Sequence, residues 1–448
     1  MSLGNPLRFC NPFQTSANGP HADWRVSGSD DDGGAGVSTA TIKVAIALAY
    51  VVFAILLNSV GAVILQSVEY FHVSNLAAST LEASKDLPIA VVSFLVANTL
   101  PRWGYRRSMI AGLLAVGGAC VVMASADAFW ATRLLFVAVG ASFAVVKVAA
   151  YSSVGLLAPS PRAHASLLSL LEGVFMLGVL GGYFLFGAFV DARDPGSAHW
   201  LQVYWVLAAA SFASAALLAA SRLDETAASG DAPERGVRGT LRAMWALARQ
   251  PLTAVFIAAV FLYVLIEQGV GTWLPTFNRE GLGLSAPLSI QAASIFAAGL
   301  AGGRLAAGVI VRRTGWFPLL LGCLGGMVVL ILVTLPLAAR PATGTIERWA
   351  DAPPAALLLP LVGAFMAPIY PILNSAVLSA IAPARQPTMV GLIVVISALG
   401  GTTGSFVIGR VFALIGPAQA FYLLLVPIAA LAVAIVRLRA VRARAGTG

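Results

Sequence analysis

The sequence predicts an all-α membrane protein with twelve transmembrane helices in two six-helix bundles, and three observations support this prediction. Apolar residues make up 59% of the chain and charged residues only 10%, with a mean hydropathy of +0.87, whereas soluble domains have roughly 45–50% and 25%. The apolar runs are continuous and reach the ~20 residues that a helix needs to cross a bilayer, unlike the ~10-residue alternating segments of membrane barrels. One charged stretch divides these runs into two equal sets.

The first bundle is predicted at residues 41–221, after a tail at 1–40 that is polar and rich in Gly, Ser and Asp. Because this tail lacks the basic and apolar regions of a signal peptide, we expect it to be disordered and cytoplasmic. The apolar runs predict helices at 43–66, 80–100, 107–126, 130–155, 163–189 and 202–221.

The second bundle is predicted at residues 251–438, between a charged linker at 222–250 and a basic tail at 439–448. The linker contains five arginines, and basic loops stay in the cytoplasm. We therefore expect an inner-membrane protein with the linker and both termini in the cytoplasm. The apolar runs predict helices at 252–275, 286–311, 317–338, 355–381, 387–412 and 418–437.

Charge and motif content argue against several other function classes. The net charge is +9, but the basic residues lie between apolar runs and at the C-terminus, which is typical of membrane topology and not of nucleic-acid binding. The three cysteines are far apart and the four histidines do not cluster, so we expect no disulfide framework and no metal site. Without a Walker loop or an enzyme signature, we expect no cofactor, no ATP-driven transport and no enzyme.

Three charged residues, Lys147, Glu172 and Glu267, interrupt long apolar runs. A charge at bilayer depth costs at least ~2.5–3.5 kcal/mol, so such residues usually have a function. Lys147 shares a helix face with Tyr151, and this face suits a cavity wall. We predict that Lys147 either binds an anionic or hydroxyl-rich solute or balances the charge of an acid that binds and releases a proton. The alternative is a static salt bridge between helices.

The two glutamates are candidates for coupling solute movement to protons. A carboxylate at bilayer depth that binds and releases a proton near neutral pH can carry it across the membrane. Glu172 fits this role, with permanent pairing to Lys147 as the alternative. Glu267 precedes Gln268 and the segment GVGTWLPTF, whose glycines and proline permit bending. We therefore predict a gate and a solute contact at Glu267.

Other polar residues in the spans have two open interpretations. Glu82, Lys85 and Asp86 form either an outer gate or an interfacial salt bridge. Arg304 is interpreted as structural, with its side chain reaching the interface. Trp273 stacks on a sugar ring or anchors a helix at the interface.

Two clusters of glycines are expected to pack helices closely: Gly178, Gly181 and Gly182, and Gly400, Gly401 and Gly404.

A basic, glycine-containing turn recurs at the same point of each half. The segment ANTLPRWGYRRS follows the second predicted helix and GVIVRRTGWF follows the eighth, so that Arg102-Trp103-Gly104 matches Arg313-Thr314-Gly315. A parallel duplication predicts such a repeat.

The six-plus-six division and these turns resemble the major facilitator superfamily, whose signature loop reads Gly-x-x-x-Asp-Arg-x-Gly-x-Arg/Lys-Arg/Lys. Both copies lack the Asp, with Pro101 and Arg312 in its place. The resemblance implies gating roles for Arg102, Arg106 and Arg313, to which we add Lys85 and Asp86 from the second predicted helix.

Three segments resemble the fucose/proton symporter branch of this superfamily: KVAAYSSVGLLAP, FLYVLIEQGVGTWLPTF and APIYPILNSAVLSAI. Two positions depart from it. The branch has an acid where this chain has Lys147, and the first helix carries Asn58 without the acid of many sugar symporters. The resemblance implies a sugar as solute, whereas Lys147 favours an organic anion.

Together these observations predict a secondary active transporter that rocks two bundles about a central site and is coupled to protons. The alternatives are an exporter of amphipathic compounds and a transport-inactive receptor or scaffold. We expect a monomer whose partners are the solute, protons and the lipid bilayer. The residues predicted to bind the solute are Asn58, Lys147, Tyr151, Glu267, Gln268, Tyr370 and Asn374.

Overall fold

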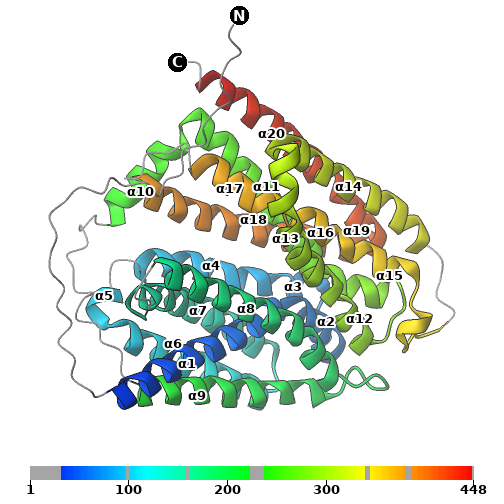
Figure 1. The fold of residues 1–448 in the computed structure, drawn as a ribbon. Coiled ribbons are helices and arrows are strands. Elements are labelled where there is room, and N and C mark those ends of the chain that lie inside the picture. Colours follow the sequence, from blue (N-terminus) through cyan, green and yellow to red (C-terminus); the bar gives the residue numbers. More distant parts are fainter. Residues whose placement is uncertain are drawn as a thin grey trace, which may run out of the picture.

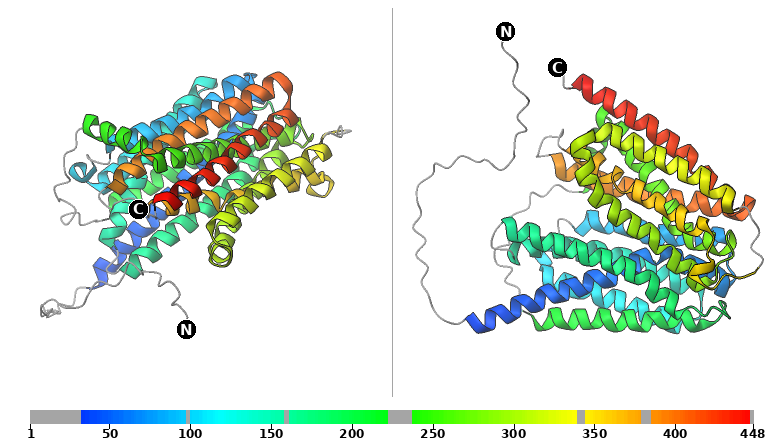
Figure 2. Two further views of the ribbon diagram at one scale, coloured as in Figure 1. Left: turned by 90° about the horizontal axis from the view of Figure 1, so that it is seen from above. Right: turned by 45° about the vertical axis from the view of Figure 1, so that its right-hand side comes forward.

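The structure is a computed structural model in which the chain is helical, apart from turns and one isolated bridge between Leu284 and Ile346 in the described residues. Figure 1 shows long helices in two layers, with the first half of the sequence in the lower layer and the second half in the upper layer. Figure 2 shows the same separation from other directions. The residues that the structure describes are 32–96, 100–157, 161–221, 237–338, 344–378 and 385–445.

The first predicted span is two helices, because the chain breaks at Ser59. Its first helix also begins at Asp32, inside the predicted tail, while residues 1–31 lie outside the described part. The helices of the first half are α1 (Asp32–Asn58), α2 (Val60–Phe71), α3 (Asn75–Ala78), α4 (Thr80–Val96), α5 (Leu100–Trp103), α6 (Tyr105–Ser125), α7 (Phe129–Leu157), α8 (Pro161–Phe189), η1 (Ala198–Gln202) and α9 (Val203–Ala220).

In the second half, the predicted span at 355–381 is divided into short helices, because Pro360 and Pro368 lack the N–H that a continuous helix needs. The last helix continues into the predicted basic tail. The helices are α10 (Val237–Ala248), α11 (Pro251–Glu280), α12 (Ala286–Ala292), α13 (Ser294–Thr314), α14 (Trp316–Ala338), η3 (Trp349–Asp351), α15 (Pro354–Leu358), η4 (Leu359–Leu361), α16 (Val362–Met366), α17 (Ile369–Leu378), α18 (Gln386–Ile415), α19 (Pro417–Leu423) and α20 (Leu425–Ala445).

Eleven segments of the described chain are long and apolar enough to cross a membrane. The second predicted helix is not among them, because α4 has 17 residues and contains Glu82, Lys85 and Asp86. Residues 97–99, at the end of that predicted span, lie outside the described part. The protein is therefore a multi-pass membrane protein, and α4 carries three charged residues in its first turns.

The two halves meet where α4 packs on α18, α2 on α11, and α8 on α12 and α13. These contacts are close. A Cβ atom at Gly61 would lie 2.7 Å from the carbonyl oxygen of Thr272, and one at Gly187 would lie 2.9 Å from the side chain of Gln291. Both contacts lie toward the end of the molecule that holds α3 and α12, which we call the α3 side (Figure 1). The opposite end, where α10 lies, is called the α10 side.

Glycines also allow α18 to pack directly on the backbone of α11. A Cβ atom at Gly400 would lie 2.6 Å from the carbonyl oxygen of Phe261, and one at Gly404 would collide with the carbonyl of Leu265. In the first half, Gly178 of α8 packs on Val51 and Ala54 of α1 in the same way. Gly178, Gly400 and Gly404 therefore pack helices within each half, as the sequence predicts. The prediction is wrong for Gly181, where a Cβ atom would meet nothing within 4 Å.

The substitution Gly404→Ala is expected to destabilise the protein, because the added methyl group meets the fixed backbone of α11. We expect a cost of about 1–3 kcal/mol, typical of overpacking, measured as a lower midpoint of thermal unfolding in detergent. Gly181→Ala is the matched control, since a Cβ atom there meets nothing within 4 Å. Equal midpoints for the two variants would contradict this packing.

Candidate functional site

A cavity of about 320 Å³ lies between the two halves, with walls from α1, α2, α4, α7, α8, α11 and α13. Of the residues predicted to bind solute or protons, it brings together Asn58, Lys147, Glu172, Glu267 and Gln268. Lys85 also lines it, together with Glu82 and Arg304, for which no solute contact is predicted. Three of the residues predicted to contact the solute are not in its lining: Tyr151, Tyr370 and Asn374.

Lys147 of α7 is exposed in this cavity and lies beside aromatic rings. Its Nζ atom is 5.4 Å from the ring centroid of Phe143 and 5.6 Å from that of Tyr151. These cation–π contacts replace only part of the hydration of an ammonium group. Within the described part of the chain, Lys147 forms no ion pair. The structure therefore shows neither of the predicted static salt bridges, to Glu172 or to Glu267.

Glu172 of α8 lies on the same side of the cavity as Lys147 and is held there by Tyr151. The hydroxyl of Tyr151 donates a hydrogen bond to Oε1 of Glu172, and the Tyr151 ring stacks on Tyr50 of α1 at a centroid distance of 6.4 Å. Tyr151 therefore positions Glu172 from behind the cavity wall. One aromatic group links the lysine and the carboxylate of this half.

In the second half, Glu267 of α11 has two partners. The hydroxyl of Tyr263 donates to its Oε1 atom at 2.9 Å, and Nη2 of Arg304 lies 3.9 Å from the same atom. The ring of Tyr370 stacks on Tyr263 at 5.5 Å, so Tyr370 acts on the cavity through another residue. The i, i+4 spacing of Tyr263 and Glu267 in the sequence indicates this contact.

Arg304 therefore belongs to the cavity, and its interpretation as a purely structural residue is corrected. It interrupts the run AGGRLAAG, which is the same signal that singled out Lys147, Glu172 and Glu267. Its place near the end of the predicted span favours a side chain that reaches the interface, but its guanidinium lies toward Glu267. Only the placement of α13 beside α11 could reveal that partner.

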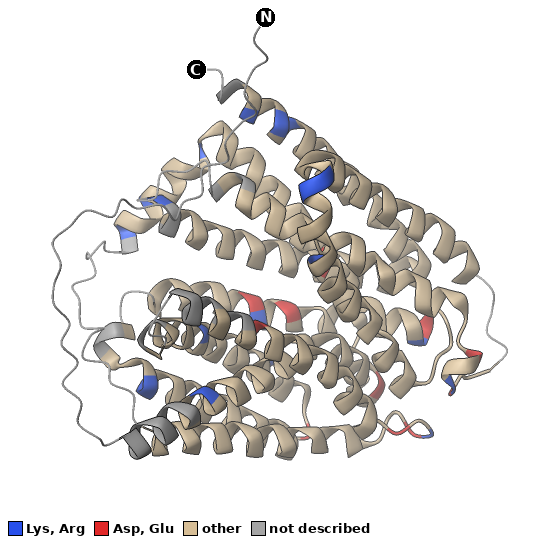
Figure 3. Ribbon diagram, viewed as in Figure 1, with Lys and Arg blue, Asp and Glu red and all other residues tan. Residues whose placement is uncertain are grey.

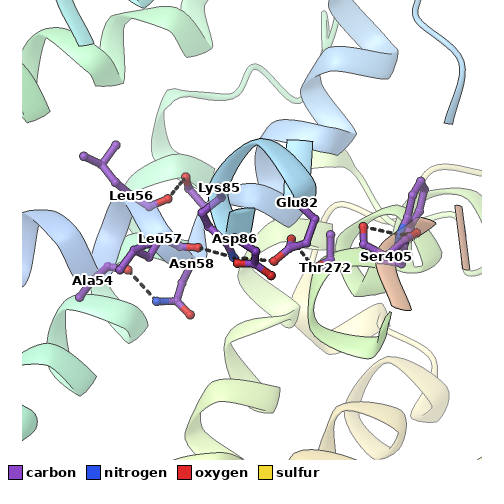
Figure 4. Close-up of polar contacts among 11 residues, drawn as sticks. Ala54, Leu56, Leu57, Asn58, Glu82, Lys85, Asp86, Thr272 and Ser405 are labelled. Carbon is purple, nitrogen blue, oxygen red and sulfur yellow. Dashed lines mark hydrogen bonds and ion pairs between the residues drawn. The ribbon is translucent and has the colours of Figure 1, made fainter. Parts of the chain in front are cut away.

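Glu82, Lys85 and Asp86 form a charge cluster buried at the edge of the cavity, with exposed fractions of 0%, 5% and 7%. The Nζ atom of Lys85 lies 2.5 Å from Oε1 of Glu82 and 3.6 Å from Oδ1 of Asp86. It also donates to the carbonyl oxygen of Leu57 at 3.4 Å, beside the break at Ser59 (Figure 4). Lys85 therefore ties α4 to the broken first span.

The same cluster reaches across to the second half of the chain. Oγ1 of Thr272 on α11 donates to Oε2 of Glu82 at 2.9 Å (Figure 4). The carboxylate of Asp86 lies against Gly401 of α18, where a Cβ atom would be 2.5 Å away. Farther toward the α3 side, Nε of Arg279 pairs with Oε1 of Glu69 at 2.8 Å. These contacts close the α3 side of the cavity.

Comparison with solved structures finds this fold in several membrane transporters. A variant of the nucleoside transporter NupG has a TM-score of 0.69 at 13% identity, covering 90% of this chain and 99% of that one. An inward-facing, unoccupied bacterial homologue of the human lysosomal transporter Spinster gives 0.64 at 16%, covering 92% and 95%. The transporter FucP, in its outward conformation, gives 0.57 at 18%, covering 90% and 99%. These likenesses show the fold.

The sequence itself matches the family model of the Major Facilitator Superfamily over residues 46–405. The chain belongs to the Major Facilitator Superfamily. The predicted resemblance to this superfamily is thereby confirmed, and the protein is a transporter and not an enzyme. Comparison with curated proteins finds no match. Within the described residues, no group of three or more His, Cys, Asp and Glu side chains could hold a metal ion.

The superfamily's signature-loop arginines lie away from the cavity. Nε of Arg106 donates to the carbonyl oxygen of Leu218 at 2.7 Å and its Nη2 to that of Ala219 at 2.5 Å, so it caps the C-terminal end of α9. Arg313 is exposed in the last turn of α13. The side chain of Arg102 lies outside the described part. Gating roles for these residues stay predictions.

Trp273 and Asn58 each donate a hydrogen bond to a backbone carbonyl oxygen. Trp273 neither lies at an interface nor faces a solute: it is fully buried, and its Nε1 atom donates to the carbonyl oxygen of Ser405 at 2.9 Å. Both predicted roles of Trp273 are therefore wrong, because α18 supplies a buried acceptor. Asn58 donates to the carbonyl oxygen of Ala54 at 2.8 Å and lines the cavity.

The substitution Lys85→Met is expected to cost about 3–5 kcal/mol of stability, because it leaves two buried carboxylates without their cation. The triple variant Glu82→Gln/Lys85→Met/Asp86→Asn should recover much of this loss, since no uncompensated charge remains. Thermal unfolding in detergent measures both effects. Lys43→Met, at an exposed lysine of α1, is the control. Equal stability of Lys85→Met and Lys43→Met would contradict the compensating role of Lys85.

Proposed function

We propose that this transporter moves a small polar solute across the inner membrane by alternating access of two six-helix bundles, as a monomer. The cavity between the halves supports this proposal, since its volume of about 320 Å³ suits a small molecule and residues of both halves face it. Arginines on the α10 side, such as Arg242, Arg249 and Arg442, support a cytoplasmic position of that side and of both termini.

Lys147 is the observation that favours an organic anion as the solute. An exposed ammonium group in the cavity, with aromatic contacts and no ion pair among the described residues, offers a site for a carboxylate. The ring of Phe175, which lines the same cavity, suits an apolar face of the same molecule. A bound anion would supply the ion-pair partner that Lys147 lacks among the described residues.

A sugar is the second candidate solute. The side chains of Asn58 and Gln268 line the cavity and can bind hydroxyl groups. A solved D-xylose-proton symporter also has the fold of this chain, with a TM-score of 0.63 at 14% identity. Lys147 makes this candidate the weaker one, because a neutral sugar leaves the ammonium group without a counter-ion.

The contacts at the α3 side support alternating access as the transport mechanism. They join the halves through Glu82 and Thr272, and again through Glu69 and Arg279. Lys147 and Glu172 are exposed in the cavity on the other side of this closure. A change of access therefore requires these contacts to separate while new ones form at the α10 side.

Glu267 and Arg304 support coupling of the solute to protons. A proton bound at Glu267 removes the charge that attracts Arg304, which lies 3.9 Å away. The freed guanidinium could then bind an anionic solute in the same cavity. In this scheme, binding of the proton at Glu267 strengthens binding of the solute, and binding of the solute strengthens binding of the proton. Symport requires this mutual effect. Glu172, bound by Tyr151, is the second candidate proton carrier.

The substitution Lys147→Gln is expected to lower uptake of the transported organic acid by at least about ten-fold, because the carboxylate loses a charge-assisted contact. The measurement is uptake into proteoliposomes with an imposed pH gradient, using a panel of organic acids and sugars. Lys43→Gln, remote from the cavity, should behave as the unmodified protein. A transported solute whose uptake is unaffected by Lys147→Gln would contradict the role of this residue.

The substitution Glu267→Gln is expected to abolish the response of uptake to the pH gradient while solute exchange between the two sides continues. Glutamine keeps the size and the bond to Tyr263 but cannot carry a proton. Glu347→Gln, at an exposed position beyond the spans, should leave the response intact. Gradient-driven uptake that persists in Glu267→Gln and in Glu172→Gln would argue against both carboxylates as proton carriers.

A further inference from the structure

An apolar groove of about 500 Å³ lies between α13, α14 and α16, separate from the central cavity. Small residues such as Gly302, Ala306 and Gly322 form its walls. The span that contains α13 is the least buried of the eleven candidate spans, and Leu305 on this helix is 80% exposed. Because these helices cross the membrane, the groove opens toward lipid.

The groove extends from the middle of α13 to its end at the α10 side, where Thr314 and Pro318 are its last lining residues. The length of α13 between Gly302 and Thr314 is about 18 Å at the helical rise per residue. One leaflet of the hydrocarbon core is about 15 Å deep. An acyl chain of a single leaflet therefore matches this groove in length and in polarity.

Basic residues surround the turn where the groove ends. Arg439 of α20 lies over the ring of Phe317 at 4.3 Å, and Arg442 lies over the ring of Trp316 at 5.6 Å. Figure 3 shows basic segments on the neighbouring upper ends of α13 and α20. The residues of this arginine cluster are Arg312, Arg313, Arg439 and Arg442.

The arginine cluster has no acidic partner in the described residues, where the ion pairs involve other cations. A guanidinium binds phosphate in a planar, bidentate geometry, and basic pockets between transmembrane helices bind anionic headgroups. We propose that the groove and the arginine cluster form a binding site for one anionic phospholipid, with an acyl chain in the groove and its phosphate among the arginines.

The same side of the molecule offers a matched pair of arginines that lie outside the groove described above. On α10, Arg249 lies over the ring of Trp245 at 5.0 Å, and Arg242 is exposed on the same helix. If arginines here served only to orient the chain in the membrane, both sets would behave alike toward lipid. The proposal requires that they differ.

Native mass spectrometry of the full chain tests this, with phosphatidylglycerol and phosphatidylcholine of identical acyl chains as probes. One phosphatidylglycerol should bind at least about ten-fold more tightly than phosphatidylcholine. Arg312→Gln/Arg313→Gln should reduce this preference by at least about five-fold, while Arg242→Gln/Arg249→Gln leaves it unchanged. Equal affinity for the two lipids, or equal effects of the two double variants, would overturn the proposal.

The groove itself is tested without changing any charge. A Cβ atom at Gly322 meets nothing within 4 Å, and the same holds at Gly325 on the same helix, but only Gly322 lines the groove. Gly322→Leu should therefore weaken phosphatidylglycerol binding several-fold, while Gly325→Leu does not. Binding unchanged by Gly322→Leu would overturn the acyl-chain site, whether or not the arginine variants fold.

Discussion

The buried charge cluster of α4 is the interaction on which the arrangement of the two halves depends. Lys85 compensates two carboxylates of its own helix and binds the carbonyl of Leu57 at the break in the first span. Each of these charges alone would cost several kcal/mol in the membrane, so α4 is stable there only because they compensate one another. Because Glu82 also binds Thr272, the break, the place of α4 and the closure at the α3 side form one unit.

The two halves of the chain present different charged groups to the cavity beside this cluster. The first half presents Lys147 among aromatic rings, and the second presents Glu267 with Arg304 nearby. Glu172 and Glu267 are each held by a tyrosine hydroxyl, which fixes the position of the carboxylate without neutralising its charge. In the proposed site, a solute would therefore meet a lysine without an ion pair among the described residues on one side, and a separable ion pair on the other.

The sequence predicts most of the spans, because the thickness of the bilayer sets the length of the apolar run that crosses it. It does not predict the break at Ser59, since the carbonyl beside it is bound by Lys85 from a different helix. The sequence identifies Lys147 and Glu267 as candidates, because a charge within an apolar run is a local signal. It does not predict the contacts of Arg304 and Trp273, because their partners Glu267 and Ser405 lie on other helices and only packing brings them together.

The closure at the α3 side has two layers that differ in their access to dissolved ions. Glu69 and Arg279 form its rim, with side chains 28% and 23% exposed, whereas Glu82 and Lys85 lie beneath it and are buried. Mobile ions screen exposed charges over a Debye length of about 8 Å at physiological ionic strength but do not reach buried ones. Rising salt on that side therefore weakens the rim while the inner layer keeps the two halves together.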